Sequence, residues 1–347
     1  MYSIRDLVKH DILLDLVKHD IPLYKTLFLF ILSIMLLSSF KTIATERTLL
    51  FSGGPDGGTF QYFSKGISEY LSKELDGYKI LNEASAGSVE NLRRLNKREA
   101  DFGITYSGDL YLGRNGRLSN NARQYRNVHA VAYLYGAPAH LVVLDDKQIN
   151  SVTELVGKKV AIGAAGSGAA ASAQRFFESM GIWKKIEPQY IGYSAGAAAL
   201  GEGLIDALWV FAGYPNSAVI QAASANKIKL LQTYTEAKKS GKLFEDFPFY
   251  SKVVIPADTY PGVDYEVITI QDSALWTAGR HVAEELVQKA AEMIYEPNGL
   301  KYLVSVKSTA KAMSIDSGLT GIVTPVHNGA QNFWKAKGKT LTAEQSR

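Results

Sequence analysis

Hydrophobic and polar residues follow two different periods along the chain from residue 47 onward. Short runs rich in β-branched and aromatic residues predict strands over residues 47–52, 78–83 and 101–106. Longer amphipathic runs predict helices over residues 60–75 and from residue 88. Strands that alternate with helices are typical of an α/β protein with largely parallel sheets.

The same order of elements recurs in the middle of the chain. It predicts alternating strands and helices at residues 158–163, 167–180, 189–192, 195–203 and 206–211. The repeated order predicts two similar lobes, each containing a strand, a glycine-rich turn and a helix.

The two glycine-rich turns occupy matching positions. One is GPDGGT at residues 54–59, and the other is GAAGSG at residues 163–168. The N-terminus of a helix has free backbone N–H groups and partial positive charge, and glycine lets an anion approach them closely. The matched turns therefore predict an anion site, although each could also be a tight turn and helix cap without a ligand.

The predicted lobes require the chain to cross between them twice. We place the first crossing near residues 137–141 and the return near residues 255–261, where two prolines interrupt the helical pattern. This gives a first lobe of residues 45–137 plus 258–347 and a second lobe of residues 138–257.

Residues 1–44 are predicted to be an export leader. The apolar run LFLFILSIMLLSSF at residues 27–40 follows Lys25, and its length suits the core of a signal peptide. The segment Thr42-Ile43-Ala44 places small residues at positions −3 and −1 of a cleavage site. We therefore expect cleavage near Ala44 and export to the periplasm. An uncleaved membrane anchor remains an alternative, because the segment before the run is long and contains a nine-residue repeat, DLVKHDILL and DLVKHDIPL.

Composition excludes several classes of chemistry. The 347 residues include no cysteine, so thiol catalysis, cysteine-bound zinc, disulfides and a lipid-anchored cysteine are excluded. The net charge of +4 is small and dispersed, so no nucleic-acid partner is expected. The histidines are scattered without metal-binding spacing, so no metal and no cofactor are expected.

Short motifs raise two alternatives, nucleotide binding and serine hydrolysis. Neither glycine turn has the lysine of a phosphate-binding P-loop, and Ala165 breaks the dinucleotide pattern GxGxxG. GYSAG at residues 192–196 matches the GxSxG nucleophile elbow, with Ser194 as the candidate nucleophile and His281 or His327 as the candidate base. This leaves a secreted serine hydrolase as an alternative.

Five blocks of the sequence carry a family resemblance. They are SGGPDGGTFQYFSKGISEYL, AGSVENLRRLNKREADFGITYSGD, LVGKKVAIGAAGSG, LIDALWVFAGYPNSAV and TPVHNGAQNFWKAKG. In this order they resemble the TAXI subclass of solute-binding proteins of TRAP transporters. The resemblance implies a type II periplasmic binding-protein fold, with two α/β lobes and a ligand cleft between them.

The resemblance also implies a function and a set of ligand-binding residues. We expect a non-enzymatic, monomeric receptor that delivers a small organic anion, such as the dicarboxylates glutamate or 2-oxoglutarate, to a TRAP membrane permease. An exported adhesin or sensor-associated module of the same fold is a further alternative. The ligand-binding residues that the resemblance implies are Gly57, Gly58, Thr59, Ser88, Asn91, Tyr106, Asp109, Gly166, Ser167, Gly168, Gly213 and Pro215. Trp209 and Tyr214 are added because they fall at the carboxyl end of a predicted strand, where ligands of open α/β sheets bind. Pro55, Asp56 and Trp209 depart from the family pattern.

Overall fold

The computed structural model describes residues 46–118 and 122–347. The expected export leader at residues 1–44 lies outside the described residues. Arg47–Arg347 form one compact unit. Within the described part of the chain, no helix is both long and apolar enough to cross a membrane.

Ten strands are described. They are β1 (Arg47–Ser52), β2 (Tyr78–Glu83), β3 (Phe102–Tyr106), β4 (Val128–Leu144), β5 (Lys159–Ala161), β6 (Glu187–Gln189), β7 (Ala207–Phe211), β8 (Ile228–Leu230), β9 (Ser251–Ile255) and β10 (Val267–Gly279). Their order is β2-β1-β3-β10-β4-β7-β5-β6, with β8 paired to β4 and β9 paired to β10.

Eleven α-helices are described in the same residues. They are α3 (Thr59–Glu74), α4 (Ser88–Asn96), α5 (Ser107–Arg114), α6 (Gly168–Ser179), α7 (Tyr193–Gly201), α8 (Ser217–Ala225), α9 (Thr233–Ser240), α10 (Lys242–Asp246), α11 (Glu284–Tyr295), α12 (Pro297–Val306) and α13 (Asn328–Ala336). Short 3-10 helices are η1 (Asp145–Lys147), η2 (Val152–Leu155), η3 (Trp183–Lys185) and η4 (Ser308–Ala312).

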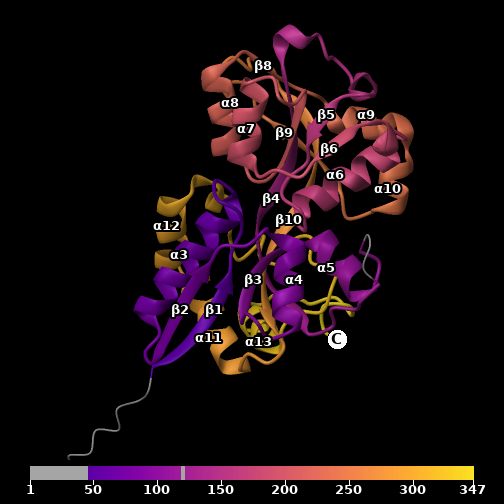
Figure 1. Cartoon of the computed structure of the whole chain (residues 1–347). Helices are drawn as coiled ribbons and strands as arrows, with labels where there is room; N and C mark the ends of the chain where they lie inside the picture. The colour runs from indigo at the N-terminus through magenta and orange to yellow at the C-terminus, as the bar shows by residue number, and fades with distance from the viewer. Residues whose placement is uncertain (1–45, 119–121) are drawn as a thin grey trace, which may run out of the picture. The chain divides into compact units, whose positions relative to one another are not determined.

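The first lobe is built on the parallel strands β1, β2 and β3. β1 pairs in parallel with β2 along its whole length and with β3 at Phe51 and Ser52. The helices α3, α4, α5, α11, α12 and α13 surround this sheet (Figure 1). The strands Arg47–Ser52 and Tyr78–Glu83 have the bounds that the hydrophobic pattern predicts.

The second lobe repeats the parallel arrangement with β5, β6 and β7. β5 pairs in parallel with β6 and with β7. The helices α6 to α10 surround these strands (Figure 1). Its core is strongly aromatic, because Trp209 of β7 packs against Phe176 and Phe177 of α6.

Two long antiparallel strands connect the lobes. β4 pairs with β10 in its first part and with β7 from Ala139 to Val143. β10 pairs with β9 from Val267 to Gln271 and with β3 from Ala274 to Ala278. Both strands therefore contribute to both sheets. The lobe boundaries at residues 137 and 258 stay predictions.

These observations confirm the expected fold class. The chain has two α/β lobes, with parallel strands in each and a pair of crossing strands between them, as expected for a type II periplasmic binding protein.

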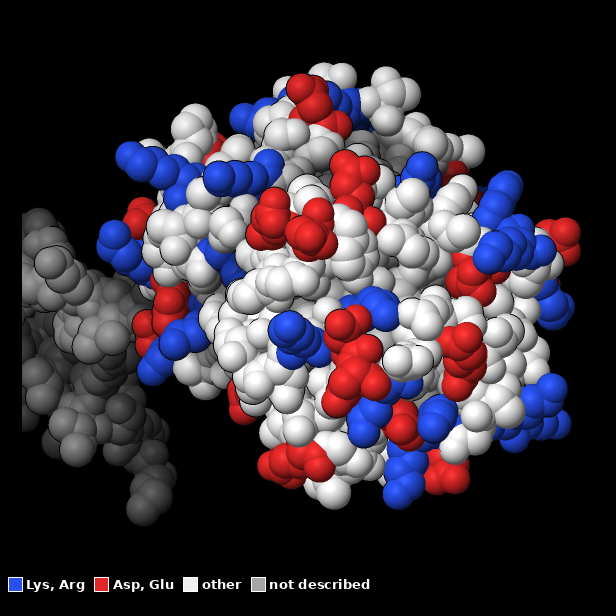
Figure 2. Space-filling model, turned by 90° about the horizontal axis from the view of Figure 1, so that it is seen from above, with Lys and Arg blue, Asp and Glu red and all other residues white. Residues whose placement is uncertain are grey.

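Lysine, arginine, aspartate and glutamate are interspersed over the face that Figure 2 shows, so no stripe of one charge runs across that face.

Candidate functional site between the lobes

Four helix N-termini converge on a cavity between the lobes. α3 and α4 begin at the cavity from the first lobe, and α6 and α7 begin there from the second. The residues that precede these helices, Gly58, Gly87, Ser167 and Gly192, all line the cavity. Since each N-terminus presents unpaired N–H groups and partial positive charge, their convergence creates an electropositive cavity without any charged side chain.

Glycine precedes three of these helices, so no capping side chain occupies the N–H groups of their first turns. Gly58, Gly87 and Gly192 provide no side-chain hydrogen bond to the first turn of their helices. At α6, the Oγ of Ser167 accepts a hydrogen bond from the backbone N–H of Ala170 at 3.0 Å. The Ser167 hydroxyl proton is thereby left available to donate to a ligand.

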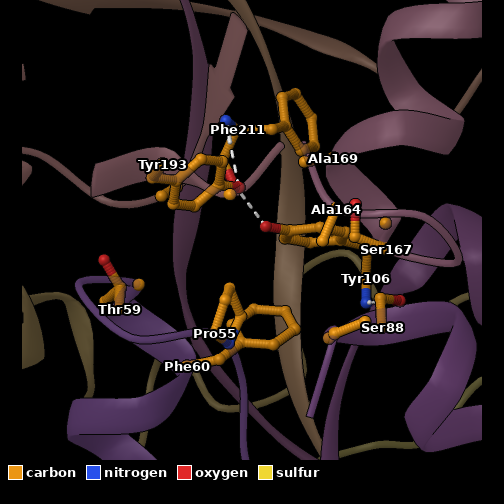
Figure 3. Close-up of a pocket in the computed structure, with 16 residues that line it drawn as sticks. Pro55, Thr59, Phe60, Ser88, Tyr106, Ala164, Ser167, Ala169, Tyr193 and Phe211 are labelled. Atoms are coloured by element: carbon orange, nitrogen blue, oxygen red, sulfur yellow. Dashed lines mark hydrogen bonds between the residues drawn. The ribbon is translucent and has the colours of Figure 1, made fainter. Parts of the chain in front are cut away.

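Two tyrosines close one side of the cavity. The hydroxyls of Tyr106, from the first lobe, and Tyr193, from the second, both donate to the backbone oxygen of Phe211 (Figure 3). Burial raises the pKa of both phenols, so both remain protonated donors. The ring of Phe60 packs 4.8 Å from the ring of Tyr106, between ring centroids.

The cavity is small because the lobes touch. Its volume is about 20 Å³, which holds about one water molecule. A Cβ added to Gly168 would lie 2.6 Å from the Cβ of Ser88 and 2.7 Å from Oδ2 of Asp109. The structure is therefore a closed arrangement, and a ligand larger than water requires the lobes to separate.

A buried ion pair lies beside the cavity. Nη2 of Arg175 on α6 is 2.8 Å from Oδ1 of Asp109 on α5, and both side chains are almost fully buried. The Nε of Arg175 also donates to the hydroxyl of Tyr250 at 2.9 Å. Oδ2 of Asp109 has no hydrogen-bond partner among the described residues.

A second carboxyl group faces this pair from β10. Asp272 accepts hydrogen bonds from the backbone N–H groups of Gly108 at 3.0 Å and Ser273 at 2.7 Å. Burial and the nearby Asp109 raise the pKa of Asp272 to about 7, although Arg175 and the two N–H groups act in the opposite direction. The cluster therefore places two carboxyl groups around one guanidinium.

The comparison with protein families identifies the chain. The model of the NMT1-like family matches residues 51–338. The chain belongs to the NMT1-like family. This membership confirms the coarse expectation of a periplasmic type of solute-binding protein.

Several solved structures are similar in fold to this NMT1-like protein. MatC from Rhodopseudomonas palustris with bound malate has a TM-score of 0.49 and 16% identity, covering 76% of this chain and 88% of its own. A putative L-cystine ABC transporter from Listeria monocytogenes has a TM-score of 0.46 and 18% identity, covering 75% and 94%. The GluR0 ligand-binding core from Nostoc punctiforme in complex with L-glutamate has a TM-score of 0.46 and 14% identity, covering 74% and 97%.

The NMT1-like protein brings some of the expected site residues to the cavity. Those that line it are Gly58, Thr59, Ser88, Tyr106, Ser167 and Gly168. Each lies at the start of a helix or at the end of a strand. Their role in ligand binding stays a prediction.

Other expected residues join the lobes at positions outside the cavity lining. Asp109 forms the ion pair with Arg175, and the backbone oxygen of Gly57 accepts a hydrogen bond from Ser217 at 3.0 Å. The segment Gly213-Tyr214-Pro215 contacts the first lobe through its backbone oxygens, which accept from Thr59, Thr309 and Lys307, respectively.

Three expected residues lie away from the cavity. Asn91 donates to the backbone oxygens of Gly53 and Ile104, and it accepts from Ser52 and Ser85. Trp209 is fully buried in the core of the second lobe, where its Nε1 donates to Ser172 at 3.0 Å. Gly166 is on the surface. The first two therefore have structural roles in this arrangement.

Sequence reasoning missed several residues at the site. Arg175 lies seven positions after Gly168, which places both on one face of α6. An arginine seven positions after the turn glycine, and therefore on the same helix face, is a signal that the sequence offers. Phe60 and Tyr193 each stand within two positions of a cap glycine, but nothing in the sequence indicates that both line one cavity from opposite lobes.

The candidate nucleophile lacks the partners of a catalytic serine. Ser194 is exposed in the first turn of α7, and its Oγ makes no hydrogen bond with a histidine among the described residues. The histidines proposed as bases lie elsewhere: His281 bonds to Asp101, and His327 caps α13. In the same described residues, no cluster of three or more histidine or acidic side chains could hold a metal ion.

Proposed function

We propose that this NMT1-like protein is an extracytoplasmic receptor that binds a small organic anion between its two lobes. The observation that carries the proposal is the convergence of the N-termini of α3, α4, α6 and α7 on one cavity. Helix N-termini favour anions through their free N–H groups and their dipoles.

The proposed ligand class is a small carboxylate, with dicarboxylates such as glutamate and 2-oxoglutarate as the first candidates. Each lobe presents two helix N-termini to the cavity, so N–H groups of the two lobes can contact a carboxylate from opposite sides. Arg175 supplies a full positive charge when the lobes separate and its contact with Asp109 breaks. No cofactor is part of the proposal.

Binding is proposed to involve hinge closure about the crossing strands β4 and β10. The closed cavity of about 20 Å³ leaves too little room for such a ligand. The ligand therefore enters an open form and replaces some of the direct contacts between the lobes when they close on it.

The proposed partner is a membrane-embedded TRAP permease, as for TAXI-subclass receptors, and the receptor acts as a periplasmic monomer. The sequence blocks that resemble this subclass support the assignment. Uptake of the ligand into vesicles that contain the permease, with and without the receptor, tests this part.

Calorimetric titration and thermal unfolding with a panel of mono- and dicarboxylates test the binding proposal. A ligand at a hundredfold excess over its Kd raises the free energy of unfolding by about 2.7 kcal/mol. We expect at least one carboxylate to bind and to be recovered chemically unchanged. A folded sample that none of the panel stabilises would contradict the small-anion proposal.

A further inference from the structure

A basic pocket lies at the far end of the first lobe from the cavity between the lobes. Its lining consists of Arg114, Arg126, His129, Arg280, Glu284, His327, Asn328 and Arg347, and its volume is about 380 Å³. β10 runs from Ala274, beside Tyr106, to Gly279, just before Arg280. This stretch separates the two sites by about 20 Å along the strand.

Three of the four arginines of the basic pocket form no ion pair with a described carboxylate. Arg126 and Arg280 form no ion pair with any described carboxylate, and both are exposed. Arg114 donates to the backbone oxygens of Arg126 at 3.1 Å and Val128 at 2.9 Å, which fixes its guanidinium without cancelling its charge. The fourth arginine, Arg347, forms an ion pair with Glu344, which does not line the basic pocket.

The positively charged groups of the basic pocket lie close enough to lower one another's pKa. Burial lowers the pKa of Arg114, and the neighbouring Arg126 and Arg280 lower it further. Burial also lowers the pKa of His129 to about 3, with contributions from Arg114, His327 and Arg280. Nδ1 of His129 is buried and has no hydrogen-bond partner among the described residues.

We propose that the basic pocket binds a phosphate-bearing anion. Three guanidinium groups without an ion pair among the described residues converge on one hollow, whose lining holds a single carboxylate, that of Glu284. A bound dianion reduces the repulsion between the guanidinium groups. A phosphate group offers enough acceptor oxygens for several guanidinium forks and for a histidine N–H, whereas a single carboxylate leaves most of the positive charge uncompensated. The hollow is larger than inorganic phosphate, so it also accommodates an organic substituent or a lipid headgroup.

The test uses residues 47–347, which form one compact unit, and the double variant Arg126→Gln/Arg280→Gln. The control is Arg117→Gln, because Arg117 is also exposed but lies outside the basic pocket. Inorganic phosphate and glycerol 3-phosphate are titrated by calorimetry, and vesicles of phosphatidylglycerol with phosphatidylcholine are used for co-sedimentation. The pKa of His129 is measured by NMR from its ring resonances, with and without the phosphate probe.

We expect the double variant to bind the phosphate probe at least tenfold more weakly, while the control binds like the wild type. The phosphate probe should raise the pKa of His129 in the wild type, and the double variant should be at least as stable as the wild type without the probe. Binding of the soluble phosphates or of the vesicles alone, lost in the double variant, identifies the source of the phosphate group. Absence of saturable binding to every probe, or binding that the double variant retains, would overturn the proposal. Binding of carboxylates between the lobes should be unchanged in the double variant, so the two proposals fail independently.

Discussion

Arg175 of the second lobe and Asp109 of the first form a nearly fully buried ion pair, with 2.8 Å between Nη2 and Oδ1. Neither charge is stable alone in such surroundings, because burial without a partner costs several kcal/mol per ion. Because the two residues belong to different lobes, separation of the lobes breaks the pair. The pair therefore links closure of the lobes to the electrostatics of the site.

Replacing Arg175 with methionine should lower the free energy of unfolding by about 3–5 kcal/mol, because Asp109 loses its buried partner. Urea denaturation measures the change. Arg93→Met is the matched control, since Arg93 pairs with Glu99 at 2.7 Å in an exposed position. An exposed pair contributes only about 0–1 kcal/mol. Equal losses in the two variants would show that the buried pair has no special role.

Asp272 should make stability fall as the pH rises from about 4 to about 7. Its folded pKa of about 7 lies above its ordinary value of 3.8, so the folded state binds the proton more tightly. The stability that this proton provides is therefore present at low pH and lost as pH rises through the folded pKa. Urea unfolding of the wild type and Asp272→Asn across this range isolates the contribution. If the wild type instead gains stability relative to the variant as pH rises, Asp272 is ionised in the fold.

Gly168→Ala should weaken ligand binding at least tenfold by holding the lobes apart. The added Cβ would lie 2.6 Å from both the Cβ of Ser88 and Cδ2 of Tyr106, too close for closure. Gly192→Ala is the matched control, because Gly192 lines the same cavity and a Cβ there meets no atom within 4 Å. Calorimetry gives the affinities, and small-angle scattering should show a larger radius for Gly168→Ala. Wild-type affinity in both variants would argue against tight closure at Gly168.

Ser194→Ala should leave ligand affinity and any background hydrolysis of an activated ester unchanged. The serine is exposed and has no histidine partner among the described residues, so nothing activates its hydroxyl. A burst assay with an activated ester, run on both proteins, checks this. A burst that disappears in the variant would restore the hydrolase alternative.

Local patterns in the sequence determined the parallel strands of both lobes, the helices α3, α4, α6 and α7 and the positions of the glycine turns, but not the long strands β4 and β10. The short apolar runs within RTLLFS and YKILNE predict β1 and β2 with their observed bounds. Such signals depend on residues close together in the chain, so they survive without knowledge of the fold. The helix starts after Gly58 and Ser167 follow from the same local chemistry.

The tertiary structure alone decided which of these helix starts meet and which charges pair. Arg175 and Asp109 are 66 residues apart, and Tyr106 reaches Phe211 across 105 residues. Trp209 shows the opposite case, since its place at a strand end suggested the ligand site, whereas packing against α6 buries it in the core. Contacts over such separations depend on how the two lobes close about β4 and β10. No local pattern carries that geometry, because it arises from the packing of the whole chain.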